Sequence, residues 1–71
     1  MPSKYPVLRP REIIKRLKTF GFYRVSQKGS HMKYSDGIHV VIIPNHDVVY
    51  KGTLQSILEQ AGLSLETFLE G

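Results

Sequence analysis

Apolar residues recur along this chain with two different periods, and the change of period divides it into elements. In residues 10–20 the spacing is helical, and the apolar positions are Ile13, Ile14, Leu17 and Phe20. Pro10 suits the first turn of a helix and Gly21 suits its C-terminal end. We therefore predict an amphipathic helix in PREIIKRLKTFGF.

From residue 22 to residue 43 the sequence is rich in aromatic and β-branched residues, which favour strands. The segments FYRVSQ, HMKYS and IHVVII are separated by the turn signals KGS and DG, so we predict three antiparallel strands. Successive strand residues point to opposite faces of a sheet. His31 and Lys33 should therefore face solvent, and Met32 and Tyr34 should face the core.

Pro44 cannot donate a hydrogen bond to a neighbouring strand, so it should close the third strand. A second helix is predicted in KGTLQSILEQAG, with Thr53 as its N-cap and Gly62 at its end. Its apolar stripe consists of Leu54, Ile57, Leu58 and Ala61. Ser64 is placed to cap a short last turn through Leu69.

This order of helix, three strands and helix predicts an α+β domain. Both helices should lie on one face of a three-stranded antiparallel sheet, which leaves the other face open. We expect one domain over residues 1–71, with residues 1–9 as an extended N-terminal segment.

Composition limits the classes of protein and the kinds of site. A chain of 71 residues has room for one small domain, and without cysteine it has neither disulfides nor thiolate zinc ligands. No apolar run approaches the roughly 20 residues of a membrane span, and the first residues lack the apolar region of a signal peptide. We expect a soluble, cytoplasmic protein that does not associate with membranes.

Positive charge is concentrated in the first half of the chain. Residues 1–35 hold nine lysines and arginines against Glu12 alone, whereas residues 36–71 hold Lys51 against five acidic residues. On the predicted first helix, a basic stripe is formed by Arg11, Lys15 and Lys18. Such a stripe usually faces water, but beside an open basic sheet it also suits a polyanion such as RNA.

The candidate chemistry is that of a histidine beside lysines. Imidazole exchanges protons near neutral pH, and RNA carries its own nucleophile in the 2′-hydroxyl next to each phosphate. His31 is therefore a candidate general base, and Lys28 or Lys33 is a candidate to stabilise the charge that develops at phosphorus. The acid that protonates the leaving oxygen is not defined by the sequence; His46 and His39 are the candidates.

The other histidines and the tyrosines have simpler interpretations. His39 shares a predicted strand with apolar neighbours and is interpreted as a cross-strand contact, and His46 is equally interpretable as a turn residue. The three histidines lack the ligand spacing of zinc motifs, so we expect no metal and no cofactor. Tyr23 and Tyr34 suit either base stacking or a core position.

Four stretches together resemble the HicA toxin family of bacterial toxin–antitoxin pairs. They are PREIIKRLKTFGF, QKGSHMKY, VIIPNH and YKGTLQSILEQAGLS, and they cover nearly the whole chain. The most specific motif residues are Gly29, Ser30, His31, Lys33 and Tyr34, followed by Pro44 and His46.

The resemblance implies a fold like the double-stranded RNA-binding domain and an endoribonuclease that cleaves mRNA. Because the histidines lack the spacing of metal ligands, we expect this cleavage to be metal-independent. The resemblance implies that His31 is catalytic, and we add His46 as a candidate second catalytic group. It also implies a HicB-type antitoxin, through which we expect oligomers to form. The hypothesised RNA contacts are Lys28, Gly29, Ser30, Lys33, Arg11, Lys15 and Lys18.

Two alternatives keep the same surface but give it another function. Double-stranded RNA-binding domains recognise shape and 2′-hydroxyls without cutting, so a non-catalytic RNA-binding module is the first alternative. The second is an interaction domain whose protein partner covers the sheet.

Overall fold

A computed structural model of the chain describes residues 5–70. The elements follow in the order α1 (Pro10–Thr19), β1 (Tyr23–Lys28), β2 (His31–Ser35), β3 (Val40–Pro44), α2 (Lys51–Ala61) and α3 (Leu65–Glu70). This confirms the predicted α+β order and adds a short third helix at the position of the predicted last turn.

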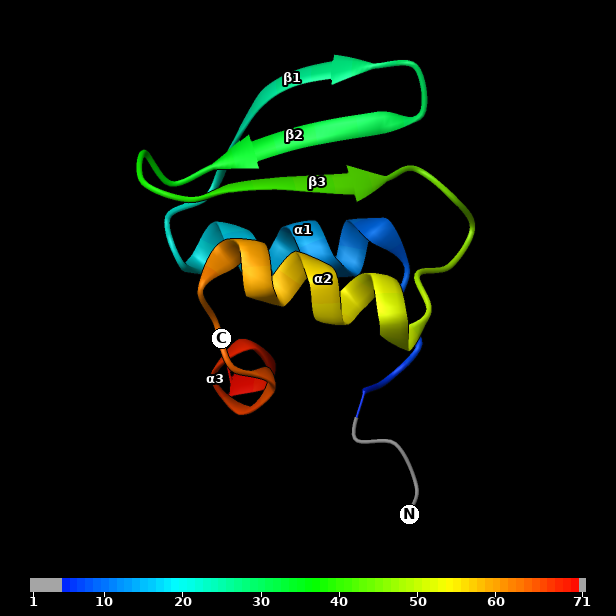
Figure 1. Cartoon of the computed structure of the whole chain (residues 1–71), viewed down its shortest axis with the longest axis vertical. Coiled ribbons are helices and arrows are strands. Elements are labelled where there is room, and N and C mark those ends of the chain that lie inside the picture. The colour runs from blue at the N-terminus through cyan, green and yellow to red at the C-terminus, as the bar shows by residue number, and fades with distance from the viewer. Residues whose placement is uncertain (1–4, 71) are drawn as a thin grey trace.

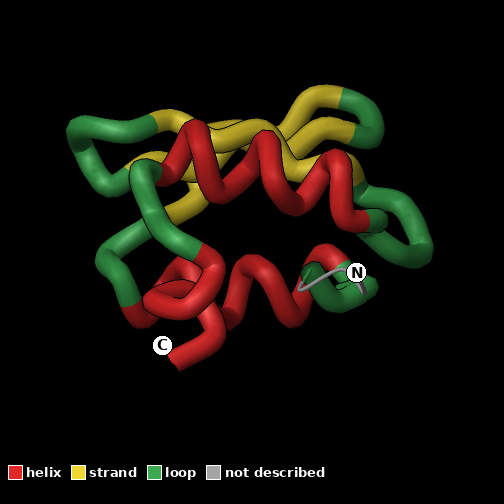
Figure 2. Tube along the Cα trace, turned by 60° about the horizontal axis from the view of Figure 1, so that its bottom comes forward, coloured by secondary structure: helices red, strands yellow, loops and turns green. Residues whose placement is uncertain are grey.

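The strands form one antiparallel sheet in the order β1-β2-β3, and α1 and α2 lie on the same side of it (Figure 1). Figure 2 shows one of the long helices running across the strands, and the other helices lie further from the sheet in that view. We call the side of the sheet that faces away from α1 and α2 the outer face.

One cluster of buried side chains joins the helices to the sheet. Alternation on β2 places Met32 and Tyr34 in this core, as predicted. The fully buried side chains of the cluster are Ile13, Leu17, Val41, Ile43, Val49, Leu54, Ile57 and Phe68. The helical and strand periods read from the sequence therefore identify the residues that hold the layers together.

Strand β1 differs from the other two strands because all six of its residues are exposed. It pairs with β2, but its register shifts between Arg24 and Ser26, which marks a β-bulge. A bulge bends and twists an edge strand, which discourages it from pairing with another chain. The helices support β2 and β3, and β1 depends on its pairing with β2.

Helix α2 begins earlier than the sequence predicted. Thr53 is not the N-cap; the cap position is Tyr50, whose carbonyl accepts from the Leu54 N–H at 2.9 Å. Gly62 ends the helix in the left-handed region, with φ of 71°. Ser64 does cap α3, because its Oγ accepts from the Thr67 N–H at 3.1 Å.

Two long-range contacts hold the first and the last described residues against the rest of the domain. Leu8 and Val49 exchange two backbone hydrogen bonds, of 3.3 and 2.6 Å, so the N-terminal segment is tied to the loop before α2. Arg16 donates from Nη1 to the Leu69 carbonyl at 2.7 Å and lies over the Phe68 ring, which joins α1 to α3. Within residues 5–70, no helix is long and apolar enough to cross a membrane.

Candidate nucleic-acid interface

The turn between β1 and β2 positions the first candidate residues. Lys28 and His31 are Cα partners that close a two-residue turn made by Gly29 and Ser30. Gly29 has φ of 60° and Ser30 does not have a positive φ, which is the pattern of a type II′ turn with glycine at its first central position. This turn therefore holds the Lys28 and His31 side chains next to each other at the end of the sheet.

The outer face continues this arrangement along β2. His31 lies in register between Lys28 and Pro44, and Lys33 lies in register between Ser26 and Ile42. His31 and Lys33 are two residues apart on one strand, so their Cα atoms are separated by roughly 7 Å. We call Lys28, Gly29, Ser30, His31 and Lys33 the hairpin site; all five are exposed.

The charged groups of the hairpin site have no protein partners in the described part of the chain. Across residues 5–70 neither Lys28 nor Lys33 is in an ion pair, and no hydrogen bond orients the His31 imidazole. Two unneutralised ammonium groups beside an accessible imidazole suit an anionic ligand that brings its own acceptors, such as a phosphodiester.

The loop after β3 reaches the same end of the sheet. The Asn45 N–H donates to the Ser30 carbonyl at 2.6 Å, which ties this loop to the hairpin turn. His46 is exposed and follows the His31 partner Pro44 by two residues. It lines a hollow of about 320 Å³ between the loop and the start of α2. The fold thus brings His46 to the end of the sheet that carries His31.

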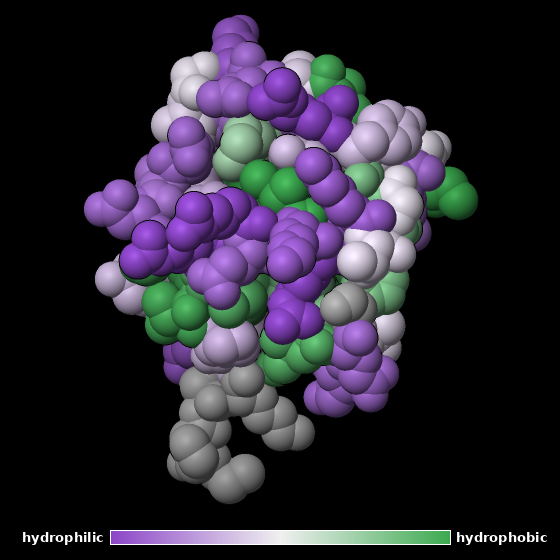
Figure 3. Space-filling model, turned by 180° about the vertical axis from the view of Figure 1, so that it is seen from behind, coloured by the Kyte–Doolittle hydropathy of each residue, from purple (hydrophilic) through white to green (hydrophobic). Residues whose placement is uncertain are grey.

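The basic stripe on α1 is not part of the outer face. Arg11, Lys15 and Lys18 are exposed, but α1 covers the inner side of the sheet. Figure 3, which views the molecule from the side of α1, shows a broad hydrophilic band there. The fold therefore presents two separate basic surfaces rather than one continuous surface.

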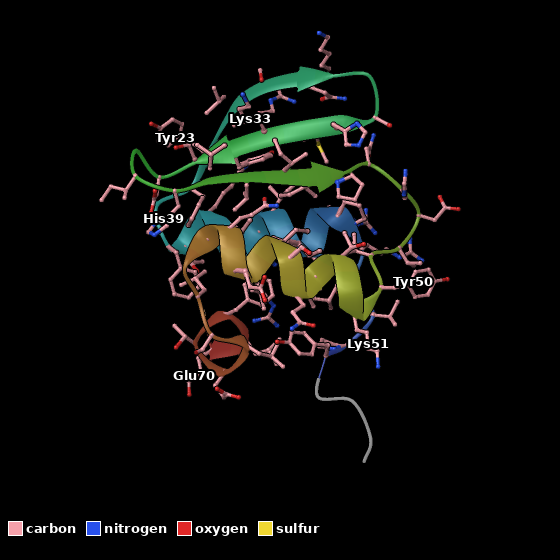
Figure 4. The ribbon with its side chains drawn as sticks, viewed as in Figure 1. Tyr23, Lys33, His39, Tyr50, Lys51 and Glu70 are labelled. Carbon is pink, nitrogen blue, oxygen red and sulfur yellow. The ribbon has the colours of Figure 1, made fainter. Side chains whose placement is uncertain are left out.

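His39 has a different role from the one expected of it. It precedes β3 and lies in the β2–β3 turn instead of making a cross-strand contact, and its Nδ1 lies 3.0 Å from Asp36 Oδ2. Its ring also lies against Gly62 at the end of α2. Figure 4 shows His39 at the end of the sheet where this turn lies.

Asp36 organises that turn. Its Oδ1 accepts from the backbone N–H of His39 at 2.6 Å and from that of Ile38 at 2.9 Å. The His39 N–H contributes most, followed by the His39 side chain, and together with Ile38 they lower the pKa of Asp36 to about 2. These bonds hold residues 38 and 39 in the turn, which is why the strand begins at Val40.

Tyr34 and Tyr23 lie on different faces of the sheet, although the sequence suits either a core position or base stacking for both. Tyr34 is in the core, whereas Tyr23 is on the outer face as the Cα partner of Ser35. Sequence alone does not separate them, because the bulge in β1 changes which residues of that strand face outward.

Among residues 5–70, no group of three or more His, Asp or Glu side chains is arranged to hold a metal ion.

The fold and the hairpin site define a small α+β protein with an exposed, basic, histidine-bearing sheet end. A family model for the HicA toxin of bacterial toxin–antitoxin systems matches residues 10–63, from the start of α1 to just beyond α2. The chain belongs to the HicA toxin family and is the toxin component of a toxin–antitoxin system, which implies an antitoxin partner. The comparison with curated proteins gives no match.

Proposed function

We propose that this toxin is a metal-independent endoribonuclease that cleaves mRNA at the hairpin site. The observation that carries the proposal is the accessible His31 imidazole, placed beside Lys28 by the Gly29-Ser30 turn and next to Lys33 on β2. The family match supports a nuclease-like toxin in general terms. Messenger RNA as the substrate and cleavage without a metal are our extensions of it.

The proposed reaction uses the nucleophile that RNA provides. His31 accepts the proton of a 2′-hydroxyl, and the resulting oxygen attacks the adjacent phosphorus. The bond from phosphorus to the 5′-oxygen breaks as the new bond forms, and the leaving oxygen takes a proton. The products are a 2′,3′-cyclic phosphate and a 5′-hydroxyl, which an end-group analysis of the cleaved RNA detects.

The lysines supply electrostatic stabilisation. Negative charge builds on the phosphoryl oxygens during attack. Lys28 lies opposite His31 on β1 and Lys33 lies two residues from it along β2, and both are unneutralised cations. The Ser30 hydroxyl and the exposed backbone at Gly29 are additional donors to phosphate. A group that acts in this way accelerates the reaction without being a proton-transfer group itself.

His46 is the proposed second proton-transfer group. It needs to donate to the leaving oxygen while His31 accepts from the nucleophile. The support is its place at the same end of the sheet, where the Asn45–Ser30 hydrogen bond joins the two segments. Loss of His46 should reduce cleavage of an RNA with an ordinary 5′-oxygen leaving group more than that of a substrate with an activated leaving group.

The basic stripe of α1 is proposed as a second RNA-binding surface. Because Arg11, Lys15 and Lys18 lie away from the hairpin site, they should increase affinity without changing the cleaved position. Removing all three charges should make RNA binding less dependent on salt. For a single strand, the slope should fall by roughly 0.7 for each phosphate that the stripe neutralises.

The family match supports an antitoxin partner, and the kind of antitoxin and the cellular location are our proposals. We propose a HicB-type antitoxin, encoded alongside the toxin, that inhibits it and brings it into oligomers in the cytoplasm. Expression of the toxin alone should arrest growth, and co-expression of the neighbouring gene should relieve the arrest.

The decisive experiment compares two histidines at opposite ends of the sheet. His31→Ala should abolish cleavage of a single-stranded RNA while it changes the RNA dissociation constant by less than about tenfold. His39→Ala is the matched control, because it removes an imidazole outside the hairpin site and should leave cleavage unchanged. Excess EDTA should have no effect on the parent protein; cleavage that stops in EDTA would contradict metal independence.

The alternative function is RNA binding without cleavage. The observation in its favour is that no side chain within residues 5–70 orients the His31 ring, whereas catalytic histidines are often held by a partner. If His31→Ala weakened binding and any observed cleavage by the same factor, His31 would be a contact residue and this alternative would replace the enzyme.

A further inference from the structure

Tyr23 is an exposed aromatic side chain on the outer face with no evident structural role. It is 54% exposed, and no residue of its strand β1 is buried. Within residues 5–70 its hydroxyl has no hydrogen-bond partner. A single exposed apolar side chain is common on a protein surface, so the interest of Tyr23 depends on the residues beside it on the outer face.

The strand register places Tyr23 on the same face as the hairpin site. Three rows cross the outer face of the sheet, and the first is Lys28, His31 and Pro44. The second row is Ser26, Lys33 and Ile42, and the third is Tyr23, Ser35 and Val40. Figure 4 shows Tyr23 near the end of β2, with Lys33 further along the sheet.

The third row carries an accessible aromatic ring and an exposed valine on either side of a serine. Ser35 at its centre is small and 8% exposed, whereas Tyr23 and Val40 on either side are each at least half exposed. No large side chain in this row covers the Tyr23 ring, so one face of the ring is open to a ligand. Ile42 in the second row extends the apolar surface toward Lys33.

An exposed aromatic ring in line with cations has the chemistry of a single-stranded nucleic-acid platform. Bases stack on the ring while lysines hold the backbone between stacked positions. Sheets that recognise single-stranded RNA use aromatic residues on their open face in this way. A protein partner would also cover apolar residues, but the two unneutralised lysines of the first and second rows, Lys28 and Lys33, favour a ligand that carries phosphates.

We propose that Tyr23 stacks on an RNA base and sets which phosphate reaches His31. This inference deepens the proposed RNA cleavage and rests on it. The third row is four residues along β2 from the first, a distance of roughly 14 Å. Stacked nucleotides rise about 3.4 Å per step, so the stacked base lies at most about four nucleotides from the cleaved phosphate. An extended strand covers the distance in fewer nucleotides.

The test measures binding of RNA that stays intact, so it does not depend on catalysis. In a His31→Ala background, a short single-stranded RNA is bound by the protein with Tyr23, with Tyr23→Ala or with Tyr23→Phe. We expect Tyr23→Ala to weaken binding by about 5- to 100-fold. Tyr23→Phe keeps the ring and should remain within about twofold. Ile38→Ala, which removes an exposed apolar side chain outside the three rows, is the matched control and should have no effect.

A second arm identifies the base. Abasic nucleotides are introduced one at a time within four positions on either side of the cleaved phosphate. At one position the abasic RNA should bind the Tyr23 protein as weakly as intact RNA binds Tyr23→Ala, and the two losses should not add. Additive losses at every position, or no loss in Tyr23→Ala, would overturn the stacking.

The cleaved position gives an independent readout in the protein that retains His31. Tyr23→Ala should spread cleavage over neighbouring phosphates, because the base that fixes the register is no longer held. If the parent protein does not cleave RNA but the abasic coupling is present, the enzyme proposal fails and the stacking stands. If RNA binding is unaffected and only binding of the antitoxin weakens, Tyr23 belongs to the protein interface and our inference is wrong.

Discussion

Replacing Gly62 with alanine tests how the far end of the sheet is joined to α2. Gly62 has φ of 71°, a conformation in which an alanine is strained by roughly 1 kcal/mol. A Cβ at this position would also lie 2.7 Å from Nε2 of His39 and 3.2 Å from its Cδ2. The ring would have to move, and overpacking of this kind costs about 1–3 kcal/mol.

The two effects together predict a loss of about 2–4 kcal/mol. A domain of this length has a total stability of about 4–10 kcal/mol, so the loss is a large fraction of it. At roughly 4–8 °C for each kcal/mol, the thermal midpoint should fall by at least about 8 °C. Thermal unfolding followed by circular dichroism measures this shift directly.

Two further variants separate the strain from the clash. In Gly62→Ala with His39→Ala, the clash is absent and only the strain remains, so about 1–3 kcal/mol should be recovered relative to the sum of the single variants. Gly62→Asn tolerates the left-handed conformation better but keeps the clash. A midpoint that falls by less than about 3 °C in Gly62→Ala would refute the reasoning. A double variant whose loss equals the sum of the two single losses would also refute it.

Three other changes have specific expected outcomes. Folding lowers the pKa of Asp36 from 3.8 to about 2, so its charge stabilises the fold above pH 4 and this contribution is lost as the pH falls toward 2. The difference in thermal midpoint between the parent and Asp36→Asn should therefore shrink over that range. A constant difference would contradict this pH dependence. Arg16→Ala removes the bond to the Leu69 carbonyl and should destabilise by about 1 kcal/mol, with hydrogen exchange accelerating first in α3; exchange that accelerates equally in the sheet would argue against this anchor. Gly29→Ala strains the turn at φ of 60° and should displace His31. We expect kcat/KM for RNA cleavage to fall by about 10- to 100-fold. Unchanged cleavage by the folded variant would show that the turn geometry does not matter.

The elements of this fold were predictable because each has a clear period. The helical spacing of Ile13 and Leu17 and the alternation of Met32 and Tyr34 identify core residues that burial confirms. The boundary errors have local causes. Helix α2 starts ahead of Thr53 because the Tyr50 carbonyl already accepts the first helical bond, a feature that no side-chain preference reveals.

The arrangement of the candidate site was only partly predictable. Strand alternation placed His31 and Lys33 together on the open face, and the register confirms that they share it. The separation of the α1 stripe from that face depends on how α1 packs, which periodicity does not determine. The outward position of Tyr23 depends on the bulge after Arg24, and the contact of His39 with Gly62 joins residues far apart in the sequence.

The two faces of the sheet divide the protein into a part that folds and a part that we propose to be toxic, and this division has a consequence for evolution. The buried hydrophobic cluster lies on the inner side of the sheet, whereas the hairpin site is exposed and contributes nothing to this core. A single substitution of an exposed side chain of the hairpin site, such as His31→Ala, can therefore disarm the toxin at almost no cost to folding. Mutants that escape growth arrest should fall into two groups: folded proteins changed on the outer face, and unfolded proteins changed in the core that the cell degrades. Only the first group should persist at normal abundance, as inactive copies of the toxin.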